Sequence, residues 1–167
     1  MTPLSGRLLI VDDNEMNRDM LARRLERKGY VVGVTDSAHQ LPERTKQDGT
    51  DLVLLDIEMP EVSGLEALKV LREAYSPIEL PIIMVTAKNQ SEDIVKALDL
   101  GANDYLTKPV DFPVVLARIA SQLSQKRAQE AAKAFAVSLR DVSPKREGGR
   151  GNGAAPRNDS KTATPAK

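Results

Sequence analysis

Acidic residues follow two apolar runs directly, and this placement limits what the chain can fold into. One run leads into Asp12 and Asp13, and another leads into Asp56. Much later, Lys108 ends a third run with strand character. In an open α/β sheet all parallel strands end at one edge, and ligands bind outside those carboxyl ends. The sequence therefore predicts three carboxylates and one ammonium group at a single edge of a sheet.

Crowded carboxylates destabilise one another unless a positive charge lies among them. Mg²⁺ is a hard cation that prefers oxygen ligands, so it would resolve this conflict. A divalent cation beside a carboxylate and a lysine suits the handling of a phosphoryl group. We therefore expect Mg²⁺ at Asp12, Asp13 and Asp56, with Lys108 close by.

Apolar runs alternate with helical periodicity along the first 125 residues. Strands are expected at 8–11, 30–34, 52–56, 81–86 and 104–107, and helices at 14–28, at 64–74, from Ser91 to Gly101 and from Asp111 onward. In the first helix, Met16, Met20, Leu21 and Leu25 are expected to share one face. Strands separated by helices imply right-handed crossovers and a parallel sheet. Unbroken apolar strands imply that both faces are covered, so the expected fold is a doubly wound α/β domain.

The segment 36–49, between the second and third strands, has few apolar residues. If Ser37 capped a helix here, Pro42 would clash with the preceding turn. The helix therefore begins near Pro42 or is kinked there. We expect this element to be the least regular and least protected of the five helices.

Charge and composition change in the C-terminal quarter. Residues 1–125 carry 20 acidic and 14 basic side chains, whereas residues 126–167 carry 4 and 10. From Ser143 onward there is no Leu, Ile, Val or aromatic residue to offset the entropy of ordering. We predict a domain over 1–125, a helical extension over 126–142 and a disordered basic tail over 143–167.

The extension is rich in residues that favour helix. The apolar periodicity of Leu116, Ile119 and Leu123 breaks at Lys126 and Arg127 and resumes only weakly beyond them. The weak continuation at Ala128, Ala131, Phe135 and Leu139 is not a sustained heptad seam. The extension is either a helix that leads to an output module or a helix that lies on a partner.

Several classes of protein are excluded by composition. No run of about 18 apolar residues is present, so no membrane span is expected. The first residues lack the pattern of a secretory signal, and cysteine is absent, which is compatible with the cytoplasm. The single histidine, His39, has no partner for a zinc site and is expected at the surface. The predicted location is cytoplasmic.

Five signatures in this order and spacing resemble the receiver (phosphoacceptor) domain of bacterial two-component response regulators, over residues 6–125. They are Ile10–Asn14, Leu54–Pro60, Gly64, Val85–Ala87 and Gly101–Pro109. The resemblance implies a flavodoxin-like parallel sheet with strand order 2-1-3-4-5 and five helices. Met59, Pro60 and Gly64 are expected to shape the turn beside the site.

The resemblance also implies a role for each matching acidic residue. Asp56 corresponds to the phosphoryl acceptor. Asp12 and Asp13 correspond to the pair that places Mg²⁺, with Asp13 the direct ligand. The backbone carbonyl of Glu58 corresponds to the remaining protein contact to the metal.

Four further positions match groups around the phosphoryl site. Thr86 and Lys108 correspond to the hydroxyl and ammonium groups that bind its oxygens. Tyr105 corresponds to an aromatic switch residue that turns inward when Thr86 moves toward the phosphoryl group. Pro109 makes the peptide bond before it a candidate for the cis form.

Two charged residues at the mouth of the expected site bear on the lifetime of an acyl phosphate. Glu58 and Lys88 are expected to face each other across the path of the hydrolytic water. Being exposed, the pair contributes only about 0–1 kcal/mol. We predict a phosphoryl group of intermediate to long life, and Glu58→Ala with Lys88→Ala should shorten it.

The resemblance implies a sensor histidine kinase or phosphotransfer protein as donor. A downstream protein is expected on the face formed by the helix after Ser91, the strand 104–107 and the helix from Asp111. Dimerising receivers of winged-helix regulators use ion pairs there. This chain keeps Asp104 and Arg118 but has Asn103 and Val114 in place of acidic residues, so weak or different self-association is expected.

Other interpretations stay open. The chain is a receiver acting alone, or a receiver fragment of a longer response regulator or hybrid kinase whose output domain is absent here. A true enzyme, an aspartate-nucleophile phosphohydrolase, would need a second aspartate two residues beyond Asp56, and this chain has Glu58 instead. A flavin-binding module would need a phosphate-binding loop after the first strand. Direct DNA binding by the basic tail is a weaker hypothesis than a solvated linker.

Overall fold

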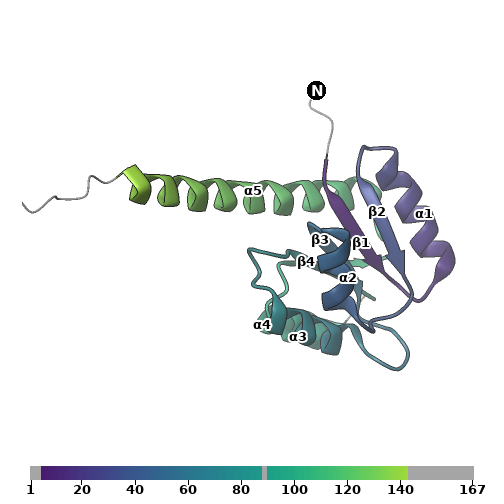
Figure 1. Ribbon diagram of the computed structural model, residues 1–167. Helices are drawn as coiled ribbons and strands as arrows, with labels where there is room; N and C mark the ends of the chain where they lie inside the picture. Colours follow the sequence, from purple (N-terminus) through teal and green to yellow (C-terminus); the bar gives the residue numbers. More distant parts are fainter. Residues whose placement is uncertain (1–4, 88–89, 143–167) are drawn as a thin grey trace, which may run out of the picture.

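The computed structural model describes residues 5–87 and 90–142. One parallel sheet holds five strands in the order β2-β1-β3-β4-β5, which confirms the predicted topology (Figure 1). The strands are β1 (Arg7–Val11), β2 (Val31–Thr35), β3 (Leu52–Asp56), β4 (Ile82–Ala87) and β5 (Asp104–Lys108). The helices are α1 (Glu15–Glu26), α2 (Leu41–Asp48), α3 (Gly64–Ala74), α4 (Ser91–Asp99) and α5 (Phe112–Val142).

Helices cover both faces of the sheet and enclose two separate cores. Alternate side chains of a strand point to opposite faces. Leu8 and Ile10 of β1 therefore join a cluster with residues of α1 and α5. Leu9 and Val11 join the second cluster, with residues of α2, α3 and α4. Because all the strands are parallel, their carboxyl ends meet at one edge of the sheet, which the helices on the two faces leave open.

Helix α1 begins where expected but faces the sheet differently from the prediction. Met16 and Met20 are 78% and 56% exposed, so the prediction that they share a face with Leu25 is wrong. Met16 and Leu25 are nine positions apart, and nine steps of about 100° place them on opposite sides of a helix. The buried stripe contains Leu25 and Ala22 together with the aliphatic part of Arg18, whose charge concealed it from a search for apolar residues.

Helix α2 begins at Leu41, with Pro42 in its first turn. Of the two alternatives, the helix that starts near the proline is therefore correct. Pro42 lacks an amide hydrogen that the first turn would leave unpaired, so it costs little there. Leu41 and Thr45 are buried and attach this short helix to the second core.

Helix α5 runs from Phe112 to Val142 without interruption, and Figure 1 shows its second half projecting from the body. The predicted boundary between residues 125 and 126 falls inside this helix. Near the end of the helix's contact with the body, Lys126 pairs with Asp51, just before β3, at 3.3 Å, and Arg127 donates to the carbonyl of Ser5. The predicted disordered tail, 143–167, lies outside the described residues. Within the described part of the chain, none of the helices has the length and apolar character needed to cross a membrane.

Candidate functional site

The turn after β1 is held by local hydrogen bonds that place two acidic side chains at the open edge. Asp12 Oδ1 accepts the amide hydrogen of Asn14 at 2.9 Å. Asn14 in turn caps α1, because its Oδ1 accepts the amide hydrogen of Asn17 at 3.0 Å. Arg18 Nη1 donates to the backbone carbonyl of Asp12 at 3.0 Å, so α1 also fixes the turn from below. Asp12 is 9% exposed and buried, whereas Asp13 belongs to the exposed residues of this turn.

Asp56 ends β3 and is only 2% exposed. Both of its carboxylate oxygens accept hydrogen bonds: Oδ1 from the amide of Glu58 at 3.0 Å and Oδ2 from Lys108 Nζ at 2.7 Å. Burial raises the pKa of the Asp56 carboxyl, although both hydrogen bonds act in the opposite direction. The structure thus holds a buried carboxylate in one orientation, with its charge incompletely compensated.

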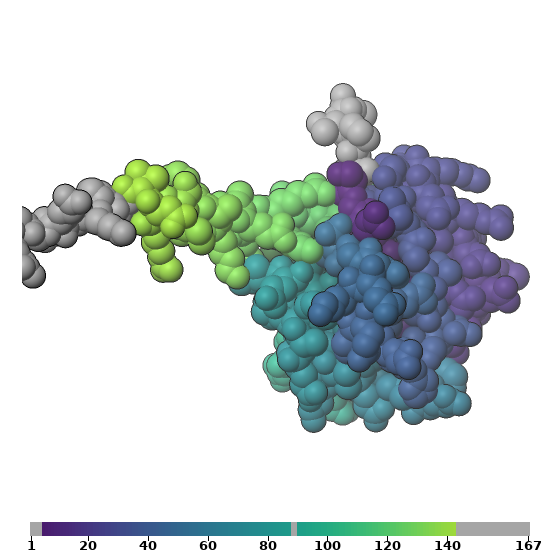
Figure 2. Space-filling view, viewed as in Figure 1, coloured from purple at the N-terminus to yellow at the C-terminus, as the bar shows by residue number. Residues whose placement is uncertain are grey.

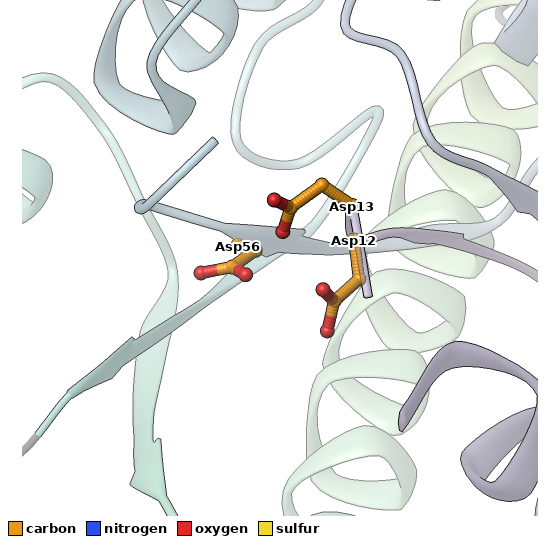
Figure 3. Close-up of side chains that lie close together, drawn as sticks. All are labelled: Asp12, Asp13 and Asp56. Atoms are coloured by element: carbon orange, nitrogen blue, oxygen red, sulfur yellow. The ribbon is translucent and has the colours of Figure 1, made fainter. Parts of the chain in front are cut away.

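The three carboxylates converge as predicted (Figure 3). Oxygen atoms of Asp12, Asp13 and Asp56 all lie within 4.8 Å of one another. Lys108 Nζ is 3.9 Å from Asp12 Oδ2, so one ammonium faces two of the three acids. The cluster keeps an excess of negative charge and offers only oxygen donors, which fits Mg²⁺ by charge and by ligand type.

Lys108 ends β5 at the same edge, beside Ala87 of β4. Burial alone would lower the pKa of Lys108, but the hydrogen bond and charge of Asp56 outweigh it and raise the pKa. The ammonium therefore stays protonated at neutral pH. The Lys108–Pro109 peptide bond is cis, as the resemblance implies.

The remaining predicted residues that the structure describes make no side-chain hydrogen bond to Asp56. Thr86 is fully buried, and its hydroxyl makes only a long hydrogen bond of 3.4 Å, to the carbonyl of Ala87. Tyr105 lies on β5 with 36% of its surface exposed, so it occupies an outward position. Glu58 is exposed, and its amide rather than its side chain binds Asp56. Lys88 lies outside the described residues, so its pairing with Glu58 stays a prediction.

Comparison with known proteins decides the family. Residues 8–120 match the model of the response regulator receiver domain. The chain belongs to this family. The receiver match spans all five strands and the first part of α5. Its end at residue 120 leaves the second half of α5 beyond the matched region.

Relatives and solved structures agree with this assignment. The chain is similar to the uncharacterized transcriptional regulatory protein YkoG of Bacillus subtilis, with 41% identity over 72% of this chain and 52% of that protein. It is similar to response regulator MprA of Mycobacterium leprae, with 36% identity over 81% of this chain and 59% of that protein. A CheY-like receiver domain protein from Methanospirillum hungatei superposes with a TM-score of 0.69 at 30% identity, over 75% and 99% of the two chains. The chain thus spans between half and three fifths of these curated relatives.

The backbone beside the site leaves no room for a side chain at Gly64. A Cβ atom here would lie 2.1 Å from the carbonyl oxygen of Asp56 and 2.6 Å from Cα of Ile57. Neither backbone atom can move without displacing the end of β3. The sequence signature therefore marks a contact between the start of α3 and the loop that carries the candidate acceptor.

We expect Gly64→Ala to lower the free energy of unfolding by about 3 kcal/mol, because overpacking against backbone has no flexible side chain to absorb it. Gly33→Ala is a matched control, since a Cβ there meets its nearest atom at an ordinary 3.5 Å. Urea unfolding of both variants measures the difference. Equal midpoints for the two variants would contradict the close approach at Gly64.

Two arginine residues that support the receiver were not predicted. Arg18 fixes the turn at Asp12, and Arg72 donates hydrogen bonds to several carbonyl groups on the opposite side of the domain. The spacing from Arg18 to Leu25, seven residues or about two helical turns, was the one available signal for the first. Nothing in the local sequence distinguishes Arg72 from a solvated helix residue.

Proposed function

We propose that this receiver accepts a phosphoryl group on Asp56, with Mg²⁺, from a sensor histidine kinase or a phosphotransfer protein. The observation that carries the proposal is the position of Asp56. It is a buried carboxylate 2.7 Å from Lys108 Nζ and within 4.8 Å of two other acids. In the transfer, a carboxylate oxygen of Asp56 forms a bond to phosphorus while the bond from phosphorus to the donor breaks. The donor atom keeps the electron pair.

The protein contributes position and charge to this reaction, since a carboxylate is a weak nucleophile toward phosphorus. Mg²⁺, when bound, would neutralise phosphoryl oxygens. Asp12, Asp13, Asp56 and the carbonyl of Glu58 would hold it. Lys108 supplies an ammonium group already oriented at the acceptor. The chain is proposed to catalyse only its own phosphorylation and dephosphorylation.

A phosphoryl group would change the packing next to the site. Thr86 makes only a long hydrogen bond, so its hydroxyl can exchange that bond for a phosphoryl oxygen at little cost. The volume that it leaves would admit Tyr105, which now lies partly in solvent. The face formed by α4, β5 and the receiver part of α5 would then differ between the two states and present the signal to a downstream protein.

The printed names of the relatives suggest a second possibility for the whole protein. YkoG is described as a transcriptional regulatory protein, and this chain spans 52% of it. A receiver fragment of a longer response regulator or hybrid kinase would have the same site and pass its signal to an attached output domain. The phosphoryl chemistry proposed for Asp56 is identical in both cases.

Acetyl phosphate and Mg²⁺ test the proposal directly. We expect close to one phosphoryl group per chain, stable to neither alkali nor hydroxylamine, as for an acyl phosphate. Borohydride reduction followed by peptide mass mapping should place homoserine at position 56. Reduction at any other carboxylate, or label that resists hydroxylamine, would overturn the assignment.

Magnesium should also stabilise the folded chain before any phosphorylation. Mg²⁺ at tenfold its dissociation constant contributes about 1.4 kcal/mol by mass action, or about 3–6 °C in Tm for a domain of this size. Asp13→Asn should abolish most of the rise, whereas Asp99→Asn, at the exposed end of α4, should keep it. A Tm that does not respond to Mg²⁺ in the parent would contradict a preformed site.

A further inference from the structure

An apolar cavity lies beside the candidate site, between α1 and the start of α5. Its volume is about 480 Å³, which falls in the range of about 300–1,000 Å³ that is typical of sites for small organic molecules. Asp12, Asp56 and Lys108 form part of its lining, so the cavity adjoins the residues of the phosphoryl chemistry. Six large apolar side chains, which have no part in that chemistry, also line it: Ile10, Leu21, Leu54, Val85, Val110 and Phe112.

Helix α1 does not fill this cavity with its own side chains. Met20 lines the cavity, yet 56% of its surface is exposed, and Leu21 is only partly buried. In Figure 2, α1 forms the margin of the body opposite the free end of α5, and its outward side chains project into solvent. Contacts at both ends hold the helix in place, because Asn14 caps its start and Leu25 is fully buried near its end. The space between α1 and α5 therefore stays open.

An apolar molecule suits this cavity better than water does. Side chains that face an empty space lose their dispersion contacts on that side. A water molecule needs about two to four polar partners, and the six apolar side chains of the lining offer none. An apolar molecule restores the lost contacts, and its own transfer out of water is favourable. The shape and the chemistry of the lining therefore favour a ligand with an apolar body.

Arg24 gives the cavity a preference for an anion. It lines the cavity, and its guanidinium carbon lies 4.1 Å from the centre of the Phe112 ring. Within residues 5–87 and 90–142 it forms no ion pair with a carboxylate. Lys108, by contrast, is already paired with Asp56 at 2.7 Å. The lining thus contains a cation that is held in place by an aromatic ring and is free to bind an anionic group of a ligand.

We propose that the cavity binds a small organic acid, with its apolar body against the six apolar side chains and one anionic group at Arg24. A guanidinium binds a carboxylate through paired hydrogen bonds, which would orient the ligand. A single negative charge suits the site, because Asp12, Asp13 and Asp56 outnumber Lys108 and would repel a second one. Binding requires neither Mg²⁺ nor a phosphoryl donor, so this proposal and the proposed function fail separately.

The dye 8-anilinonaphthalene-1-sulfonate is a suitable probe, because it has an aromatic body and one sulfonate and emits strongly only when it binds an apolar surface. The chain contains no tryptophan to interfere with its emission. We expect one dye per folded chain in a titration without Mg²⁺. Arg24→Met should weaken dye binding about fivefold, and Leu21→Trp should weaken it further by filling the cavity. Cooperative thermal unfolding shows that each variant is folded.

Two control variants locate the bound dye. Arg23→Met removes an exposed arginine of the same helix that does not line the cavity. Phe135→Glu removes an apolar side chain, 66% exposed, from the second half of α5. Both variants should bind the dye as the parent does. A parent chain that binds no dye, or a loss of binding in either control as large as in Arg24→Met, would overturn the proposal.

Competition between two small molecules tests the charge preference. Phenylacetate and phenethylamine share one phenyl ring, but the first is an anion and the second a cation at neutral pH. We expect phenylacetate to displace the dye from the parent and phenethylamine to leave it bound. In Arg24→Met the advantage of the acid over the amine should be lost. Displacement by the amine alone would show that the acidic residues determine the preference, and it would overturn the assignment of an organic acid.

Discussion

Asp56→Asn will take up no phosphoryl group, and in Mg²⁺-free buffer it will unfold at a higher temperature than the parent. Loss of the nucleophilic carboxylate explains the first effect. The second follows from burial, because the Asp56 carboxylate is 2% exposed and its pKa is raised in the folded chain. Lys108 keeps Asp12 at 3.9 Å and is itself partly exposed, so the substitution does not strand a buried charge.

The sign of the stability change depends on pH. An unfolded chain ionises Asp56 near its ordinary pKa of about 3.9, and the folded chain ionises it at higher pH. The folded state therefore binds the proton more tightly, and stability is lost as pH rises between the two values. Above the folded pKa the parent carries this loss, and the neutral asparagine avoids it.

We expect a Tm gain of about 2–4 °C at neutral pH, which is about 1 kcal/mol for a chain of this size. The gain should shrink as pH falls from the folded pKa toward the unfolded pKa, and it should be absent below the unfolded pKa. Asp99→Asn, an exposed substitution of the same type, should take up label normally and leave Tm unchanged. Label on the Asp56→Asn chain, or a lower Tm for it at neutral pH, would refute the account of this residue.

Arg72→Met should cause a large loss of stability. Arg72 Nε donates to the carbonyl of Gly101 at 2.8 Å, and Nη1 donates to that of Leu80 at 2.9 Å. Nη2 donates to Asn103 Oδ1 at 2.8 Å, and the same oxygen accepts the amide hydrogen of Ile82. One guanidinium thus ties α3 to the starts of β4 and β5. Burial lowers its pKa to about 10, so it remains charged at neutral pH.

Methionine keeps an apolar stem in place of the arginine stem but none of the five donors. Each buried carbonyl left without a partner costs about 1–3 kcal/mol, offset in part because the charge no longer has to be desolvated. We expect a net loss of about 3–4 kcal/mol by urea unfolding. Arg72→Lys should recover only part of this, because one ammonium cannot reach three acceptors in different directions.

Lys69→Met is the control for Arg72→Met. It removes a positive charge from an exposed position of the same helix, and we expect a change within about 0.5 kcal/mol. A loss for Arg72→Met no larger than for Lys69→Met would show that the hydrogen bonds of Arg72 contribute nothing net.

Asn103 belongs to the same network. It stands where the resemblance to dimerising receivers implies a second acid, and its side-chain amide makes hydrogen bonds within one chain. Its Nδ2 donates to Pro77, while Oδ1 accepts from Arg72 and Ile82. Asp104 and Arg118 likewise pair within the chain at 2.8 Å. We therefore still predict that self-association through ion pairs between subunits at this face is weak.

The open edge of the sheet was predictable because topology alone determines it. Asp12, Asp13 and Asp56 each follow a buried apolar run, and parallel strands end together whatever their side chains are. The supporting residues were not predictable in the same way. Arg18 and Arg72 have charged ends, so an apolar pattern does not detect their buried stems. The orientation of the Thr86 hydroxyl also lies beyond sequence, since a rotation about one bond determines it.

Because α5 is uninterrupted, it fixes both the distance and the rotation of its C-terminal end relative to the receiver. After Pro113 in its first turn, the helix contains no proline or glycine to absorb a twist. Each residue advances the helix by about 100° and about 1.5 Å, so Val142 is tied rigidly in both distance and orientation to the receiver. Deleting one residue between Arg127 and Val142 would turn any following segment by more than a quarter of a circle. Deleting seven residues would shorten the helix by two turns and change the orientation of a following segment by only about 20°. Changes in the length of this helix by whole heptads therefore nearly preserve that orientation.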